Sequence, residues 1–264
     1  MGKLIDFLKE MQELQAAAYS GATGTETNQP TPINLFLNIR KPVKLISRNR
    51  YLQIAFNGTL ADVHSILPKI PYSEKILIEA GTPFIKREGI KGIREIARIW
   101  GGYVVADLKT MDGGREEVSF AKSAGASAAT VLGSAPIETL NNFILQCENY
   151  GIDSMIDMIG VEEPHKILRH LKKPPKVIVL HKGRDEETIR GKVIGYKNVN
   201  KIRAKYNCII SAAGGVDLKE ARSAIFNGAN IVVANIVEDG SEYTGISTNQ
   251  DITVIAKKFL ETVE

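Results

Sequence analysis

The chain has 264 residues, of which 44% are hydrophobic and 24% charged, and its net charge is +4. This composition is typical of a globular protein with its own core, and no apolar run approaches the roughly 20 residues of a membrane span. The small positive charge argues against a nucleic-acid-binding surface, and two cysteines without a Cys-x-x-Cys pair argue against a disulfide framework. We therefore expect a cytoplasmic protein that binds neither nucleic acid nor a membrane.

Residues 1–48 differ from the rest of the chain. Apolar residues recur at helical spacing in the first segment, which predicts an amphipathic helix over 3–19, and a polar loop follows over 20–30. The sequence thus predicts an N-terminal helical extension and linker, with the main domain over 49–264. Because an apolar stripe needs to be buried, we expect this helix to pack on the main domain or on a second subunit.

From Tyr51 onward, short apolar runs alternate with helical segments. The eight runs cover residues 51–56, 75–80, 103–108, 127–132, 152–159, 176–180, 208–213 and 230–233. They are rich in Val, Ile and Ala, as parallel strands covered on both faces should be. Eight strands, each followed by a helix, predict an α/β fold, a (β/α)₈ TIM barrel. A doubly wound open sheet is the competing interpretation.

The third predicted strand ends in an unusual group of charges. Asp107 and Lys109 alternate along it, so their side chains share a face, and Asp112 follows in the loop. The active site of such a barrel lies at the C-terminal ends of the strands. A buried lysine among carboxylates stays charged and can stabilise an enediolate, whereas a structural ion pair is the alternative.

Two further strand ends carry polar residues. Glu79 ends the second strand and could be an oxygen ligand beside Asp107, although a helix cap or an ion pair would also explain it. His181 ends the sixth strand and could act as an acid or base.

A phosphate site is predicted after strands 7 and 8. Gly214 and Gly215 would let main-chain amides approach an anion, and a helix begins near Asp217. Asn235, at the end of strand 8, could supply further donors.

These motifs together resemble a known family. Glu-Ala-Gly-Thr-Pro from Glu79, Asp-x-Lys-x-x-Asp from Asp107 and Thr-Val-Leu-Gly from Thr130 are similar to the 3-hexulose-6-phosphate synthases of the orotidine-monophosphate decarboxylase superfamily. The resemblance covers about residues 50–262. It implies a (β/α)₈ barrel that assembles as a homodimer, with active sites near the interface.

The resemblance also implies roles for individual residues. Glu79 and Asp107 would hold Mg²⁺, and Lys109 would stabilise an enediolate. Asp112 would reach the partner's site, and His181 would move protons. The family joins formaldehyde to D-ribulose 5-phosphate, or runs the reverse reaction, so a phosphorylated sugar is the expected substrate.

The substrate phosphate would be bound by the turns after strands 7 and 8. These turns contain Gly214 and Gly215 and then Ala234 and Asn235. We add Arg184, three residues after His181 in the sequence, to this predicted phosphate-binding group.

Three positions depart from the synthase pattern and keep other functions open. Asn57 replaces a catalytic acid at the end of strand 1, and an amide hydrogen-bonds without charge. Arg184 stands where synthases have an apolar residue, which favours a decarboxylase of a 3-keto sugar-acid phosphate. Ala234 and Asn235 replace Gly-Gly or Gly-Arg. A catalytically silent barrel that binds a phosphorylated ligand is the third interpretation.

Overall fold

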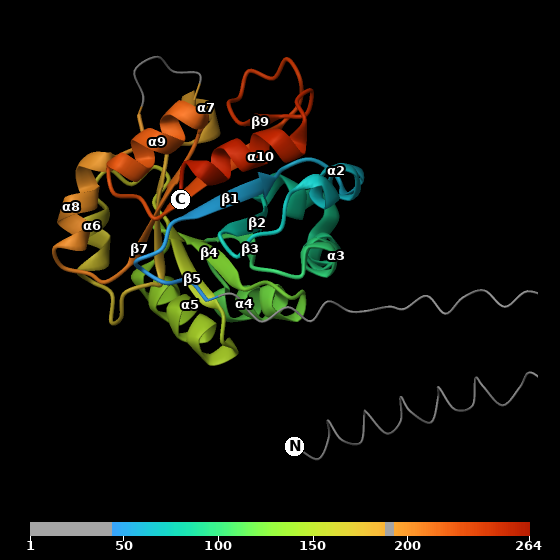
Figure 1. Cartoon of the computed structure of the whole chain (residues 1–264). Helices are drawn as coiled ribbons and strands as arrows, with labels where there is room; N and C mark the ends of the chain where they lie inside the picture. Colours follow the sequence, from blue (N-terminus) through green and yellow to red (C-terminus); the bar gives the residue numbers. More distant parts are fainter. Residues whose placement is uncertain (1–43, 188–192) are drawn as a thin grey trace, which may run out of the picture. The chain divides into compact units, whose positions relative to one another are not determined.

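The computed structural model describes residues 44–187 and 193–264. The predicted helix over 3–19 and the polar loop over 20–30 lie outside these residues. Within the described part, strands alternate with helices along the chain, and the helices surround the strands (Figure 1).

Eight parallel strands form a closed barrel. Each strand pairs with the next in the sequence, and β8 pairs with β1, with Tyr51 opposite Ile231. This closure confirms the predicted (β/α)₈ barrel, and the open-sheet interpretation was wrong. The strands are β1 (Tyr51–Phe56), β2 (Ile76–Ala80), β3 (Val104–Thr110), β4 (Ala128–Leu132), β5 (Asp153–Asp157), β6 (Val177–His181), β7 (Ile209–Ala213) and β8 (Ile231–Val237).

The helices connect successive strands on the outside of the barrel (Figure 1). None of the helices in the described ranges is both long and apolar enough to cross a membrane. The helices are α2 (Leu60–Ile66), α3 (Thr82–Trp100), α4 (Gly114–Ser123), α5 (Ile137–Tyr150), α6 (Pro164–Leu168), α7 (Arg184–Glu187), α8 (Val199–Arg203), α9 (Leu218–Phe226) and α10 (Ile252–Glu261); two 3₁₀ turns, η1 (Leu67–Lys69) and η2 (Tyr196–Asn198), and a short strand, β9 (Ile246–Ser247), complete the elements.

Helix α3 begins earlier than the sequence pattern indicates. Apolar residues at helical spacing are regular over residues 89–100, but helical residues begin at Thr82, directly after Gly81. Gly89 has φ +62° and kinks the helix, so the apolar periodicity is regular only beyond it. The earlier start brings Thr82 next to the end of β3.

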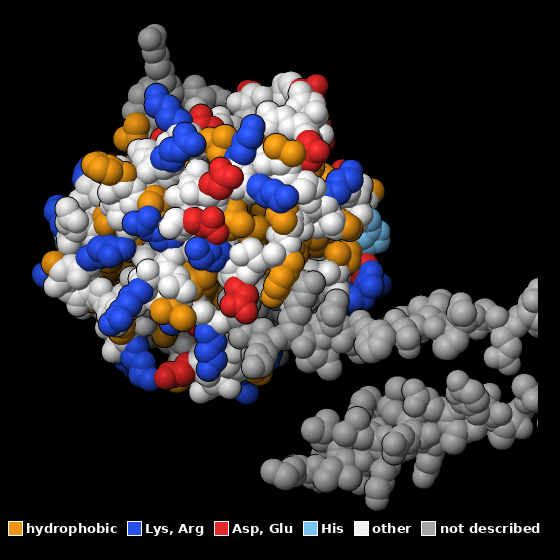
Figure 2. Space-filling model, in the orientation of Figure 1, with side chains coloured by type: hydrophobic (Ala, Val, Ile, Leu, Met, Phe, Trp, Pro, Cys, Tyr) orange, Lys and Arg blue, Asp and Glu red, His pale blue; other side chains and the backbone are white. Residues whose placement is uncertain are grey.

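The core has two layers. One lies between the strands and the helices, and the other fills the interior of the barrel. Leu45, Tyr51 and Tyr103 belong to the interior layer and are almost completely buried, so this packing begins upstream of the predicted boundary at residue 49. On the face shown in Figure 2, Lys and Arg side chains are interspersed with Asp and Glu.

Buried Asn230 ties the segment before β1 to the barrel. Its Nδ2 donates to the carbonyl oxygens of Ser47 at 2.9 Å and Asn49 at 3.3 Å. Its Oδ1 accepts from the main-chain N–H of Ile210 at 3.2 Å and from Arg203 Nη2 at 2.9 Å. One amide therefore satisfies four partners at the seam where the barrel closes.

We expect Asn230→Ala to lower the free energy of unfolding by about 2–3 kcal/mol, because it removes four hydrogen bonds and leaves the buried N–H of Ile210 without this partner. Urea unfolding followed by circular dichroism would measure the change. Asn200→Ala, at an exposed position of α8, is the matched control and should have little effect. Equal stabilities of the two variants would contradict this role.

Candidate active site

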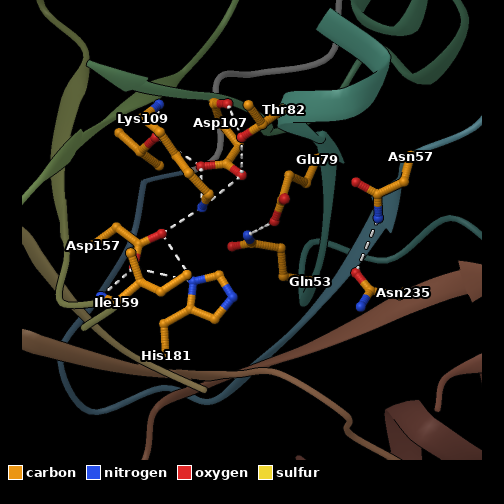
Figure 3. A network of polar contacts seen from close by, with 11 residues as sticks. Gln53, Asn57, Glu79, Thr82, Asp107, Lys109, Asp157, Ile159, His181 and Asn235 are labelled. Atoms are coloured by element: carbon orange, nitrogen blue, oxygen red, sulfur yellow. Dashed lines mark hydrogen bonds and ion pairs between the residues drawn. The ribbon is translucent and has the colours of Figure 1, made fainter. Parts of the chain in front are cut away.

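A cavity of about 200 Å³ opens at the C-terminal ends of the strands. The interior layer of the core fills the barrel below it. Figure 3 shows that polar side chains from several strands point into this space. Those that line it are Gln53, Asn57, Glu79, Thr82, Asp107, Lys109, Thr130, Asp157, His181, Arg184, Glu187 and Asn235.

Lys109 occupies the centre of this network. Its Nζ lies 3.0 Å from Asp107 Oδ2 and 2.5 Å from Asp157 Oδ2. Burial alone would lower the pKa of Lys109, but the two carboxylates outweigh it and raise the pKa above its ordinary value. The side chain is therefore an ammonium ion at neutral pH, and the prediction that Asp107 and Lys109 share a face is confirmed.

The backbone of β3 is irregular at this point. The strand advances from Ala106 to Thr110 while β4 advances only from Ala129 to Val131, so a bulge lies between them. Lys109, inside the bulge, has φ +48°, a left-handed conformation that costs about 1 kcal/mol or more for a residue other than glycine. The main-chain N–H of Lys109 donates to Thr130 Oγ1 at 2.9 Å, which helps to hold this conformation.

Two threonines fix the carboxylate of Asp107. Thr82 Oγ1 lies 2.8 Å from Oδ2, and Thr130 Oγ1 donates to Oδ1 at 2.8 Å. The same Thr130 hydroxyl contacts both Asp107 and the main chain of Lys109. Residues of β4 and of the first turn of α3 thus set the positions of the acid and of the lysine.

Asp157 links Lys109 to His181. It ends β5, is 2% exposed, and accepts from His181 Nδ1 at 2.9 Å in addition to the bond from Lys109. Burial would raise the pKa of Asp157, but His181 and Lys109 lower it below its ordinary range. Burial would lower the pKa of His181, but Asp157 raises it. With Nδ1 engaged, Nε2 is the nitrogen left for a ligand.

Glu79 lies across the cavity from this group (Figure 3). Gln53 Nε2 donates a short hydrogen bond to its Oε2. Burial, reinforced by the charge of Asp107, raises the pKa of Glu79 to about 7. Two carboxylates that face one cavity and repel each other are a donor set that suits a hard divalent cation.

A cation at this place would need ligands from outside the protein. Among the described residues, no three His, Cys, Asp or Glu side chains form a group that could hold a metal by themselves. Mg²⁺ commonly binds through one or two carboxylates and completes its shell with water and substrate oxygens. Glu79 and Asp107 fit that arrangement.

The amides of Asn57 and Asn235 form a separate pair. Asn57 Nδ2 donates to Asn235 Oδ1 at 3.1 Å, across the seam between β1 and β8 (Figure 3). Arg184 also lines the cavity, and its guanidinium lies 4.5 Å from the ring centroid of Tyr243. The structure thus brings a residue from each of the three departures, Asn57, Arg184 and Asn235, into the same cavity as Lys109.

The predicted phosphate-binding residues are only partly at the cavity. Gly214 lines it, and Gly215 follows in the same turn, with φ +102° and +63°. Ala234 is fully buried in the core between strands and helices and does not line the cavity. Asp217 caps α9 by accepting from Glu220 N–H at 2.6 Å, which leaves the glycine amides rather than the helix end as the candidate donors.

Asp112 is not brought into this cavity. It lies in the exposed loop between β3 and α4, beside exposed Met111. Besides Asp107, the carboxylate that pairs with Lys109 is that of Asp157 and not that of Asp112.

Sequence reasoning missed Asp157, Gln53 and Thr82. Asp157 lay inside an apolar run predicted over 152–159, and its signal was that a charged residue interrupts a buried strand. Gln53 and Thr82 are uncharged and gave no comparable signal, because their role depends on which strand ends meet.

The sequence matches one family model over most of its length. Residues 50–235 match the family described as orotidine 5′-phosphate decarboxylase / HUMPS. The chain is 40% identical over 176 residues to the bifunctional enzyme Fae/Hps of Methanocaldococcus jannaschii, covering 66% of this chain and 44% of that protein. It is 35% identical over 212 residues to the enzyme of the same name from Methanothrix thermoacetophila, covering 80% and 52%. The chain thus spans about half the length of the curated relatives it matches.

A solved structure covers the same region. The 3-hexulose-6-phosphate synthase from Salmonella typhimurium aligns with a TM-score of 0.70 and 26% identity, over 81% of this chain and 98% of that one. The alignment therefore includes nearly the whole of that enzyme.

We expect Asp157→Asn to lower the pKa of His181 below its ordinary value, because burial and the charge of Lys109 are then opposed only by the weaker effect of Asp107. In the unmodified protein, the raised pKa stabilises the fold fully below the ordinary imidazole pKa, and this contribution disappears as pH rises through the raised value. In the variant the dependence should reverse, because a histidine with a lowered pKa destabilises the fold as pH falls.

NMR titration of the chain's four histidines would measure the shift. Asp153→Asn is the control, since Asp153 lies at the other end of β5 and bonds Tyr103. An unchanged His181 titration in Asp157→Asn would show that the carboxylate does not govern the imidazole.

Proposed function

Because the chain belongs to the orotidine 5′-phosphate decarboxylase / HUMPS family, we propose that it is a lyase of the 3-hexulose-6-phosphate synthase type. Such an enzyme joins formaldehyde to D-ribulose 5-phosphate or catalyses the reverse reaction. The observation that carries this proposal is the Lys109 ammonium, which Asp107 and Asp157 hold at a cavity shared with Glu79 and His181. A barrel that only binds a ligand has no need of this network.

The network matches the charges that an aldol reaction develops. Removal of a proton from the ketose leaves an enediolate, and the ammonium of Lys109 stabilises its negative oxygen. His181 exchanges the proton through Nε2, while Asp157 holds Nδ1 and supports the imidazolium. In the reverse direction the same groups stabilise the enediolate left when formaldehyde departs.

We extend the proposal to a divalent cation, Mg²⁺, held by Glu79 and Asp107. Its support is that both carboxylates face the cavity and that the charge of Asp107 helps to raise the pKa of Glu79. When bound, such a cation supplies a Lewis acid for the substrate's oxygens.

The substrate phosphate and a partner subunit complete the proposal. We assign the phosphate to the turn of Gly214 and Gly215, with Asn235 and Arg184 as further candidates, because Gly214, Asn235 and Arg184 line the cavity. We also propose a homodimer in which Asp112 serves the partner's site. The exposure of Asp112 and of neighbouring Met111 supports this role.

Arg184 favours a second candidate function. A guanidinium at the cavity suits a substrate carboxylate, as a 3-keto sugar-acid phosphate carries. A decarboxylase would form the same kind of enediolate on Lys109, so the two reactions differ in what leaves rather than in the intermediate.

An assay of both reactions tests the proposal. The purified chain would be incubated with ribulose 5-phosphate and formaldehyde, and separately with 3-keto-gulonate 6-phosphate. We expect turnover of the first pair. Turnover of the keto-acid alone would favour the decarboxylase, and inactivity on both would favour the silent barrel.

Removal of divalent cations should abolish turnover, and added Mg²⁺ should restore it. Glu79→Gln should require more Mg²⁺ for half-maximal activity because one of two charged ligands is lost. Glu74→Gln, an exposed position ahead of the same strand, is the control and should respond like the unmodified protein. Full activity in excess chelator would refute the metal site.

Lys109→Ala should lower kcat by on the order of 10²–10³, because a preorganised group that stabilises the enediolate is lost. Its effect on KM should be smaller, since the phosphate contacts remain. Lys176→Ala removes an exposed ammonium at the opposite end of the barrel and serves as control. Circular dichroism would establish that both variants fold. Near-normal turnover by Lys109→Ala would exclude this mechanism.

A further inference from the structure

Glu187, at the end of α7, directs its carboxylate toward the turn after β7. It lines the cavity together with Gly214. Its Oε2 lies 3.2 Å from the point where a Cβ on Gly215 would stand, and Lys182 Nζ lies at the same distance from that point. An acid and an amine therefore flank the main chain of the turn that we assign to the phosphate.

The Oε2 atom is buried and has no hydrogen-bond partner within the described part of the chain. A buried carboxylate oxygen is ordinarily hydrogen-bonded, because desolvation without a partner is costly. The carboxylate lies against the main chain of Gly215, in the turn whose amides are the candidate donors to a phosphate. Such a place is better suited to the oxygens of a phosphate, which can accept from several donors at once.

The turn itself has little freedom to move aside. A Cβ on Gly214 would lie 1.9 Å from the carbonyl oxygen of Lys182, so the turn packs directly against the end of β6. Both glycines have positive φ, which fixes a conformation that other residues rarely adopt. When an anion enters, the Glu187 side chain is the part that can rotate away.

We propose that Glu187 is an internal competitor for the phosphate subsite: its carboxylate occupies the place beside Gly214 and Gly215 in the ligand-free protein and must leave when a phosphorylated ligand binds. The inference rests on the proposed function, since it takes this turn as the phosphate subsite. Glu187 thereby sets the affinity for the phosphorylated substrate, because only the fraction of molecules with the carboxylate withdrawn can bind it. A ligand without a phosphate does not compete with the Glu187 carboxylate for this place, so Glu187 should not set its affinity.

The experiment measures binding of inorganic phosphate and of ribulose 5-phosphate to the full chain by calorimetry. Glu187→Gln removes the charge and keeps the shape, whereas Glu187→Ala removes both. We expect each variant to bind both ligands about fivefold to tenfold more tightly. This change lies at the lower end of typical coupling free energies between competing groups. The KM for ribulose 5-phosphate should fall by a similar factor.

Asp185→Asn is the control, because it removes the same charge from the same short helix at an exposed position that does not line the cavity. Tighter binding in both Glu187 variants but not in the control supports the inference, even if the protein turned over neither substrate. Unchanged or weaker binding in the Glu187 variants would overturn it, even if the aldolase activity were present. Equal tightening in Asp185→Asn would also overturn it, since a general charge effect would then suffice.

Discussion

The ion pair between Lys109 and Asp157 is the interaction on which the candidate site depends. A buried ammonium ion is unstable without compensation, and two carboxylates at 3.0 and 2.5 Å supply it. The same carboxylate of Asp157 holds His181, so the cation and the imidazole share one anion. Removing Asp157 would therefore disturb two groups with different chemical tasks.

The closed barrel is what brings these charges together. Asp107, Asp157 and His181 come from three different strands, and parallel pairing places all three strand ends on one rim. The bulge in β3 adds a local adjustment, since Lys109 adopts a strained backbone conformation that Thr130 supports from the next strand. Strain retained beside a network of this kind indicates that the position of the ammonium matters more than the regularity of the strand.

Sequence patterns located the barrel and several of the charged residues that line its cavity. The eight apolar runs correspond to the eight strands, and Glu79, Asp107, Lys109 and His181 stood out because charges at the ends of apolar strands are unusual. Asp157 was missed because Met158 and Ile159 continue the apolar run beyond it, so periodicity could not show where β5 ends. A pattern along one strand also carries no information about which neighbour completes an ion pair.

The cavity has a neutral part and a charged part, and the positions that depart from the synthase pattern lie in or beside the neutral part. Asn57 pairs with Asn235, so the two changed positions contact each other and form a neutral pair, while Lys109 obtains its counter-charges from Asp107 and Asp157 instead. A neutral β1 end is therefore compatible with a charged lysine. Arg184 adds a cation at the same cavity. The charged group around Lys109 is thus kept while the neighbouring side chains differ from the synthase pattern, and under the proposed function these differences are the first place to look for a difference in substrate.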